Sequence, residues 1–279
     1  MQYGFPNKYA KPFKPSSSQK HPNLSLKNAD PQPNFPYGKI TPSNNLPTNS
    51  KYGNPMIPIR DENPTHIVPI VTYLLILVNI LVFIFQAFLG SNNELFVYQF
   101  ALIPADVTSL MSISSLFNIF TSMFMHAGLA HIGGNMLYLW IFGDNVEDRL
   151  GSGKYFIFYI IGGVVASITH ILTNPSSIIP TVGASGAIAA VLGAYLVLFP
   201  RQKVLTLIPL GFWMRMTMLP ASVVLLVWFA LQFFQGVLTL GGPDVGGVAV
   251  WAHIGGFVTG VVMGQLLKKP EKDYPAYHW

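Results

Sequence analysis

Six long apolar segments dominate this sequence and limit what the chain can fold into. Most are close to the roughly 20 residues that an α-helix needs to cross the hydrocarbon core of a bilayer. Only 10% of the 279 residues are charged, against about a quarter in a soluble globular protein. We therefore expect an all-α integral membrane protein with six transmembrane helices. The segments cover residues 66–89, 117–142, 155–172, 185–199, 218–240 and 251–267.

The chain before these segments has a different composition. Residues 1–65 are rich in Pro, Asn, Ser and Lys, and 11 of the 22 prolines lie among the first 60 residues. Such a segment cannot bury enough apolar surface to offset the entropy lost on ordering, so we expect a disordered tail. We expect it to act either as a solvated tether or as a docking arm for a partner or for anionic lipid. The membrane domain is expected over residues 66–268 and a short C-terminal tail over 269–279.

The basic residues predict how the spans are oriented. All 16 Lys and Arg residues lie in the two tails and in the second-to-third and fourth-to-fifth loops, and the three opposite loops have none. By the positive-inside rule both termini are then cytoplasmic. The net charge of +5 follows from this topology, so it does not indicate nucleic-acid binding. We expect the protein to lie in the plasma membrane of a prokaryote.

The composition excludes several kinds of active site. There is no cysteine, which excludes disulfides, thiol catalysis and Cys-ligated zinc. No Asp or Glu lies in the middle of a span, which excludes the paired carboxylates of an intramembrane aspartyl protease. There is no HExxH motif for a zinc metalloprotease. We assign no metal and no cofactor.

The polar residues that remain within the spans fall at one depth. In the predicted topology the second, fourth and sixth spans all enter from the outer side of the membrane. Polar side chains inside a membrane are costly and are functional candidates by default. They are His126, His131 and Asn135 at the start of the second span, Ser185 at the start of the fourth and His253 at the start of the sixth.

Small residues predict which of these helices touch. They recur every four residues on the fourth and sixth spans, and such stripes let helix backbones approach closely in lipid. Contact between the stripes would bring Ser185 against His253. A serine beside an imidazole, with no acid in reach, forms a Ser–His dyad for attack on a carbonyl group. The stripes are Ser185, Ala189 and Gly193 on one span and Ala252, Gly256, Gly260 and Gly264 on the other.

Attack by Ser185 would create an oxyanion that needs hydrogen-bond donors. Ser185 begins a helix, where backbone N–H groups are unpaired. His131 and Asn135 are four residues apart and project from one face of their span. His126 is expected to point elsewhere, toward the water that hydrolysis requires. Other roles remain open: Ser185 as a helix-packing residue, and the histidines and asparagine as interhelical contacts or as metal ligands.

Taken together, these motifs resemble the rhomboid intramembrane serine proteases over roughly residues 66–268. The resemblance implies a six-helix core that cleaves transmembrane helices near their outer ends. Ser185 would be the nucleophile, His253 the general base, and His131 and Asn135 the oxyanion donors. The matching motifs are GASG around Ser185, HAGLAHIGGN over 126–135, GDNVEDRLGSGK over 143–154 and AHIGGFVTG around His253.

The resemblance also implies supporting residues. Gly183 and His126 would support the site, Glu147 and Arg149 would form a structural ion pair at the cytoplasmic turn, and Gly256 and Gly260 would be structural. Many members of the family carry an aromatic residue four positions after the serine, stacked on the histidine. Here that residue is Ala189, so the resemblance does not say what orients His253.

The implied partners are transmembrane protein substrates and the lipid bilayer. The loop 241–250 would cap the site, and the fifth span would act as a lateral gate with Trp228 as a lipid-facing wedge. Two other classes of function are alternatives to a protease. A binder of membrane proteins could use the same fold without cleavage, while a transporter would carry internal repeats and charges at the membrane midplane, which this sequence lacks.

Overall fold

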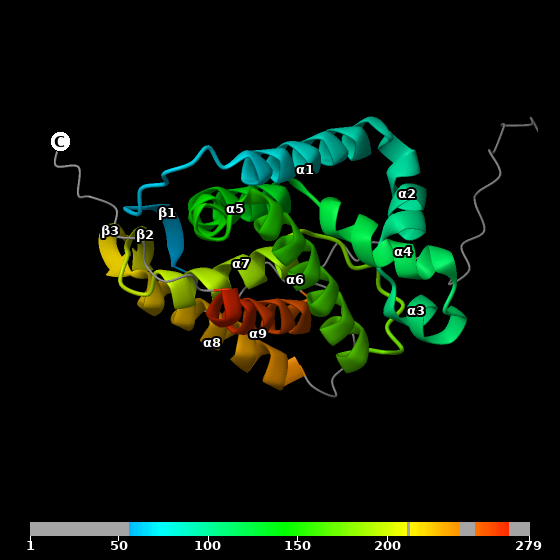
Figure 1. Cartoon of the computed structure of the whole chain (residues 1–279). Helices are drawn as coiled ribbons and strands as arrows, with labels where there is room; N and C mark the ends of the chain where they lie inside the picture. Colours follow the sequence, from blue (N-terminus) through cyan, green and yellow to red (C-terminus); the bar gives the residue numbers. More distant parts are fainter. Residues whose placement is uncertain (1–55, 211–212, 240–248, 268–279) are drawn as a thin grey trace, which may run out of the picture. The chain divides into compact units, whose positions relative to one another are not determined.

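The computed structural model describes residues 56–210, 213–239 and 249–267, which are mostly helical (Figure 1). Two single-turn 3-10 helices, η1 (Gly90–Asn92) and η2 (Ser122–Phe124), separate some of the longer elements. In chain order these are β1 (Ile57–Asp61), α1 (Ile70–Phe88), α2 (Asn93–Phe100), α3 (Pro104–Leu110), α4 (Ile113–Thr121), α5 (Leu129–Leu150), α6 (Ser152–Thr173), α7 (Ser185–Leu198), β2 (Lys203–Leu210), β3 (Trp213–Pro220), α8 (Ala221–Thr239) and α9 (Val250–Leu267).

Each of the six apolar segments contains a helix, but the helices differ in length. α1, α6, α8 and α9 are long and apolar enough to cross a membrane. The α4–η2 segment and α5 would together make a fifth span, although the two parts are bent by 78°. α7 is apolar but has only 14 residues. The protein is an integral membrane protein built on a bundle of these helices.

The bounds predicted for the second span, residues 117–142, are wrong. α4 and η2 occupy its first part, residues 125–128 are not helical, and α5 runs on to Leu150. α4 begins before the apolar run, at Ile113, and α5 begins within it, at Leu129. Ser112 caps α4 by accepting a 3.1 Å hydrogen bond from the N–H of Ser115, whereas α5 begins after Gly128 without a side-chain cap.

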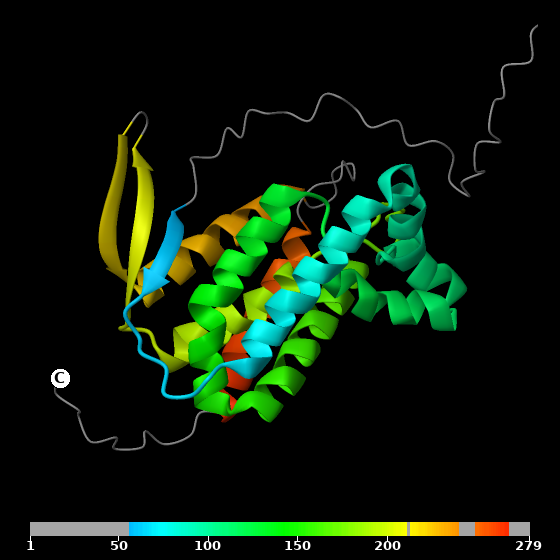
Figure 2. The ribbon, with the colours of Figure 1, turned by 90° about the horizontal axis from the view of Figure 1, so that it is seen from above.

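α7 is the central helix of the bundle. It packs against α5, α6, α8 and α9 (Figures 1 and 2), and 11 of its 14 residues are buried. A helix that is apolar on every side belongs in a core. α1 and α8 instead expose apolar side chains such as Phe85 and Phe234, which are 51% and 64% exposed. These outer helices therefore offer the apolar surface that lipid requires.

The close contact expected between the two small-residue stripes is present between α7 and α9. A Cβ at Gly256 would collide with the carbonyl oxygen of Gly186, and one at Gly260 would collide with that of Ala190. The backbones are thus too close for side chains at these positions. This packing brings the first turns of α7 and α9 together.

A three-stranded antiparallel sheet in the order β1-β2-β3 departs from the expected all-α class. β2 and β3 form a hairpin where the sequence suggested a loop, and β1 pairs with β2 so that Ile57 lies opposite Leu207. Val204 and Thr206 on one face of β2 are fully buried, while Leu205 between them is half-buried. This alternation of buried side chains is typical of a strand. The all-α prediction is therefore wrong for this part of the chain.

β1 lies within the segment that was expected to be a disordered tail. At its end Tyr195 Oη donates a 2.6 Å hydrogen bond to Asp61 Oδ2. Burial raises the pKa of Asp61, and the hydrogen bond from Tyr195 offsets only part of that effect. The tail is thus ordered at residues 57–61, because these residues have a sheet to join. The predicted tails over residues 1–55 and 269–279 lie outside the described residues.

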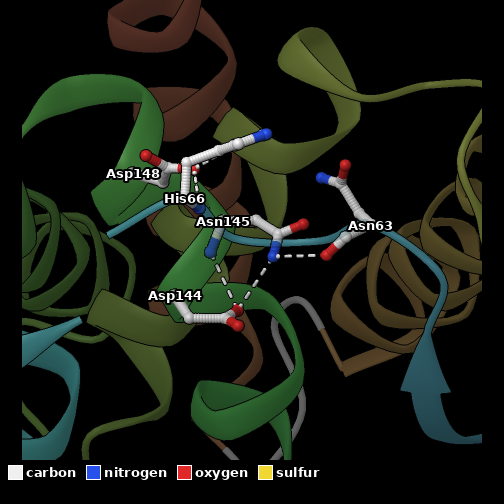
Figure 3. Close-up of polar contacts among 5 residues, drawn as sticks. All are labelled: Asn63, His66, Asp144, Asn145 and Asp148. Atoms are coloured by element: carbon white, nitrogen blue, oxygen red, sulfur yellow. Dashed lines mark hydrogen bonds and ion pairs between the residues drawn. The ribbon is translucent and has the colours of Figure 1, made fainter. Parts of the chain in front are cut away.

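Between β1 and α1 the chain is held against one end of α5 (Figure 3). The N–H of His66 donates to Asp148 Oδ2 at 2.8 Å, and His66 Nδ1 lies 3.1 Å from the same oxygen. Asn145 Nδ2 donates to the carbonyl oxygen of Asn63 at 3.2 Å and to Asp144 Oδ1 at 3.2 Å. These contacts fix the direction in which the chain enters α1.

Glu147 of α5 caps the N-terminus of the neighbouring helix α1. Its Oε1 accepts from the N–H of Val71 at 3.0 Å, and its Oε2 accepts from the N–H and the Oγ1 of Thr72, both at 2.8 Å. Ser152 Oγ donates to Oε1 at 2.6 Å. α1 has no side-chain cap of its own, and a carboxylate is stabilising at a helix N-terminus. The ion pair between Glu147 and Arg149 stays a prediction.

Candidate active site

Ser185 and His253 are in hydrogen-bond contact. Ser185 is the first residue of α7, and its Oγ lies 2.8 Å from Nε2 of His253 in the first turn of α9. The side chain of His253 is only 8% exposed. Ala184, which precedes Ser185, provides no side-chain cap to α7, so backbone N–H groups remain available beside the serine hydroxyl.

The other ring nitrogen of His253 has a partner that sequence reasoning missed. Nδ1 lies 2.7 Å from Oε1 of Gln232 on α8. Trp228, one turn earlier on α8, packs on the ring with a centroid distance of 5.8 Å. Trp228 is half-buried and its ring also contacts Phe257, so its role as a lipid-facing wedge stays a prediction. Gln232 could have been noticed as a strongly polar side chain inside an apolar span.

Gly183 brings the turn before α7 close to His131. Its φ of 134° lies in the region that favours glycine. A Cβ at this position would lie 2.8 Å from His131 Nε2 and 3.6 Å from Asn135 Nδ2. The N–H of Gly183 is bound to the carbonyl oxygen of Ser122 at 2.9 Å. His131 and Asn135 therefore lie against the turn that carries Ser185.

His126 does not point away from this group, as its spacing from His131 had suggested. Because residues 125–128 are not helical, helical spacing does not apply to it. Its Nε2 lies 2.9 Å from Asn135 Nδ2, and its ring centroid lies 5.1 Å from that of His131. Its backbone N–H donates to Gln86 Oε1 at 3.0 Å. His126 is thus a buried partner of Asn135.

A cavity of about 620 Å³ is lined by Ser185, His253 and Gln232 together with His131 and Asn135. It is lined by polar side chains from five helices. Sequence reasoning left several of them out, including Ser167 and His170, whose Nε2 lies 3.1 Å from Thr181 Oγ1. Within the ranges that the structure describes, no group of three or more His, Asp or Glu residues could hold a metal ion. The polar lining comprises His131, Asn135 and Tyr138 of α5, Ser167 and His170 of α6, Ser185 of α7, Gln232 of α8 and His253 of α9, together with Ser122 and Thr181.

The other predicted site residues lie elsewhere. Glu147 and Arg149 are in the last turns of α5, at the opposite end from His131. Gly256 and Gly260 form the α7–α9 contact rather than part of the cavity lining. The predicted capping loop over residues 241–250 lies largely outside the described residues, which omit 240–248.

The fold and the site together describe an integral membrane protein whose helical bundle has a cavity that brings polar side chains together. The family model for the rhomboid domain matches residues 114–270, which is more than half of the chain. The protein belongs to the rhomboid family.

Several curated relatives are similar over more than half of this chain. "Rhomboid protease GluP" of Bacillus subtilis is 29% identical over 73% of this chain and 36% of the relative. "Rhomboid protease GlpG" of Klebsiella pneumoniae is 29% identical over 69% of this chain and 61% of the relative. "Rhomboid protein 1, mitochondrial" of Saccharomyces cerevisiae is 32% identical over 56% of this chain and 43% of the relative.

The matched part thus spans less than two thirds of the length of each of these relatives. They come from bacteria and from a yeast mitochondrion. Membership of the family therefore gives no support to the expectation of a prokaryotic membrane.

Proposed function

We propose that this protein is an intramembrane serine endopeptidase that cleaves transmembrane helices of other membrane proteins near their outer ends. The observation that carries the proposal is the 2.8 Å contact between Ser185 Oγ and His253 Nε2 at the cavity inside the bundle. Two relatives named as rhomboid proteases support it. The proposed chemistry needs no cofactor, and its partners are transmembrane substrates within the lipid bilayer.

In the proposed reaction, His253 Nε2 takes the hydroxyl proton of Ser185 while Oγ attacks the scissile carbonyl carbon. The tetrahedral intermediate collapses, the C–N bond breaks, and the imidazolium gives its proton to the leaving amine. A water molecule, deprotonated by the same imidazole, then hydrolyses the acyl ester and restores the hydroxyl of Ser185. One histidine thus serves as base and acid in turn.

The oxygen of the scissile carbonyl group becomes negatively charged during the attack. It needs hydrogen-bond donors that are already in position before the reaction. The uncapped N-terminus of α7 offers backbone N–H groups, and its helix dipole favours negative charge. His131 and Asn135 line the same cavity and can add an imidazole N–H and an amide N–H. We assign these groups to stabilising the oxyanion.

The length of α7 supports cleavage below the membrane surface. Its 14 residues extend about 21 Å, against roughly 30 Å for the hydrocarbon core. If α7 is the fourth of six spans and its C-terminal end reaches the cytoplasmic surface, Ser185 lies about 9 Å inside the outer boundary. The six-span topology with cytoplasmic termini rests on the one-sided distribution of Lys and Arg.

A serine-reactive fluorophosphonate and a model transmembrane substrate test the proposal in proteoliposomes. Ser185→Ala should lose both labelling and cleavage, and His253→Ala should lose cleavage, while both proteins stay folded. Ser167→Ala is the matched control, since Ser167 lines the same cavity and is only 8% exposed. It should keep both activities. Undiminished cleavage by Ser185→Ala would contradict the proposal, and an unlabelled wild-type protein that still binds a transmembrane helix would indicate the non-catalytic binder.

A further inference from the structure

His253 makes a second hydrogen bond that the Ser–His dyad leaves unexplained. Its Nδ1 lies 2.7 Å from Gln232 Oε1, on the side of the ring opposite the 2.8 Å contact between Nε2 and Ser185 Oγ. The ring is only 8% exposed. Both nitrogens of a buried imidazole are therefore occupied by protein groups rather than by bulk water.

This pair of contacts selects one tautomer of His253. The amide oxygen of Gln232 can only accept a hydrogen bond, so Nδ1 must carry the proton that is donated to it. Nε2 then has the lone pair and accepts from the hydroxyl of Ser185, as a general base must. In the other tautomer Nε2 would donate to Ser185 and could not take its proton.

We propose that Gln232 is a positioning residue that holds His253 in the orientation and tautomer needed to take the proton of Ser185. This inference rests on the proposed protease function and adds a residue to its site. Because the amide is neutral, it orients the ring without favouring the imidazolium as a carboxylate would.

The neighbours of His253 do not provide this hydrogen bond. Ala189 has only a methyl side chain, which packs toward α9. A Cβ at Gly256 would lie 3.3 Å from the Cβ of Ala189. Trp228 packs on the ring at an interplanar angle of 35° and contributes apolar contact. Gln232 therefore supplies the polar contact at Nδ1, at a site where Ala189 has no aromatic ring to stack on the histidine.

The position of Gln232 also makes His253 depend on α8. α8 packs on α9 through aromatic contacts, including Phe229 stacked on Phe257 at a centroid distance of 4.5 Å. Any displacement of α8 from α9 carries Gln232 away from Nδ1. The imidazole is therefore fully oriented only while α8 lies against α9.

Two substitutions in the full-length protein test the proposal in proteoliposomes by steady-state cleavage of a transmembrane substrate. Gln232→Met keeps the shape of the side chain and removes the acceptor. We expect kcat to fall about tenfold, the factor that one ordinary hydrogen bond amounts to. KM should change little, because the lost contact serves the chemical step rather than substrate binding.

Gln232→Glu keeps an acceptor and adds a charge that favours protonated imidazole. Activity should persist at high pH, while the acidic limb of the kcat/KM profile moves to higher pH. His131, Tyr138 and His170 are the other titratable side chains among the described cavity residues. They are the same in every variant, so a difference between profiles comes from the introduced carboxylate and from His253, the imidazole that it contacts.

Phe234→Met is the control for α8, because Phe234 is 64% exposed on the same helix and should keep wild-type kcat. A lower melting temperature in Gln232→Met with unchanged kcat would show a merely structural role and overturn the inference. If Gln232→Met fails to fold, Gln232→Glu decides, and an unshifted acidic limb overturns the inference.

The same experiment separates this inference from the proposed function. A wild-type protein that neither reacts with fluorophosphonate nor cleaves substrate refutes both. A wild-type protein that is labelled and active, beside a Gln232→Met variant with unchanged kcat and KM, refutes only the role of Gln232.

Discussion

At the scale of single residues, a contact with His126 limits what Asn135 can offer to a substrate. Asn135 Nδ2 lies 2.9 Å from His126 Nε2. An amide nitrogen carries two hydrogens, so one can bind His126 while the other remains for an oxyanion. Since the backbone N–H of His126 is itself held by Gln86, α1 contributes to the placement of Asn135.

We predict that Asn135→Ala lowers kcat by about 10²–10³-fold, as expected when one oxyanion donor is lost. KM should change much less, because the donated bond strengthens mainly in the transition state. Some activity should survive through the backbone N–H groups of α7. Steady-state rates and melting temperature measured on one preparation check this prediction.

Asn174→Ala is the matched control for this substitution. Asn174 hydrogen-bonds to Thr173 at the end of α6 and is not among the cavity-lining residues, so kcat should stay at the wild-type level. A destabilised but fully active Asn135→Ala would instead mean that Asn135 only joins helices.

At the scale of helices and strands, the glycines of α9 determine how closely α7 and α9 pack, because they have no side chain. We predict that Gly260→Ala destabilises the protein by about 1–3 kcal/mol, since its Cβ would collide with the carbonyl oxygen of Ala190. Thermal unfolding in detergent measures the change. Gly153→Ala on α6 is the control, because nothing lies within 4 Å of a Cβ there. Equal melting temperatures for the two variants would refute the close contact.

Sequence patterns anticipated some elements and missed others for physical reasons. The small-residue stripe with Gly256 and Gly260 indicated the α7–α9 contact. Residues on one face of a helix recur every three or four positions, so such a stripe is visible in the sequence itself. Gln232 was missed because the apolar residues around it dominate the average hydropathy. β1 was missed because its pairing depends on a partner strand far along the chain, and the Pro-rich composition before it favours disorder.

At the scale of the whole molecule, the absence of cysteine allows the orientation of the bundle to be tested directly. We predict that Ser176→Cys reacts with an impermeant thiol reagent applied outside intact cells, while Lys203→Cys reacts only after the membrane is opened. Both residues are exposed, so reactivity reports the side of the membrane rather than burial. Reversed labelling would contradict the positive-inside assignment.

The pairing of β1 with β2 has a consequence for biosynthesis. Ile57 and Leu207 are opposite each other in the sheet but 150 residues apart in the chain. At roughly 5–20 residues per second, the ribosome needs on the order of 10–30 s to make β2 after β1 has emerged. During that interval the seven helices α1 to α7 are synthesised before β1 has a strand to join. The sheet therefore closes only after the central helix α7 has been synthesised.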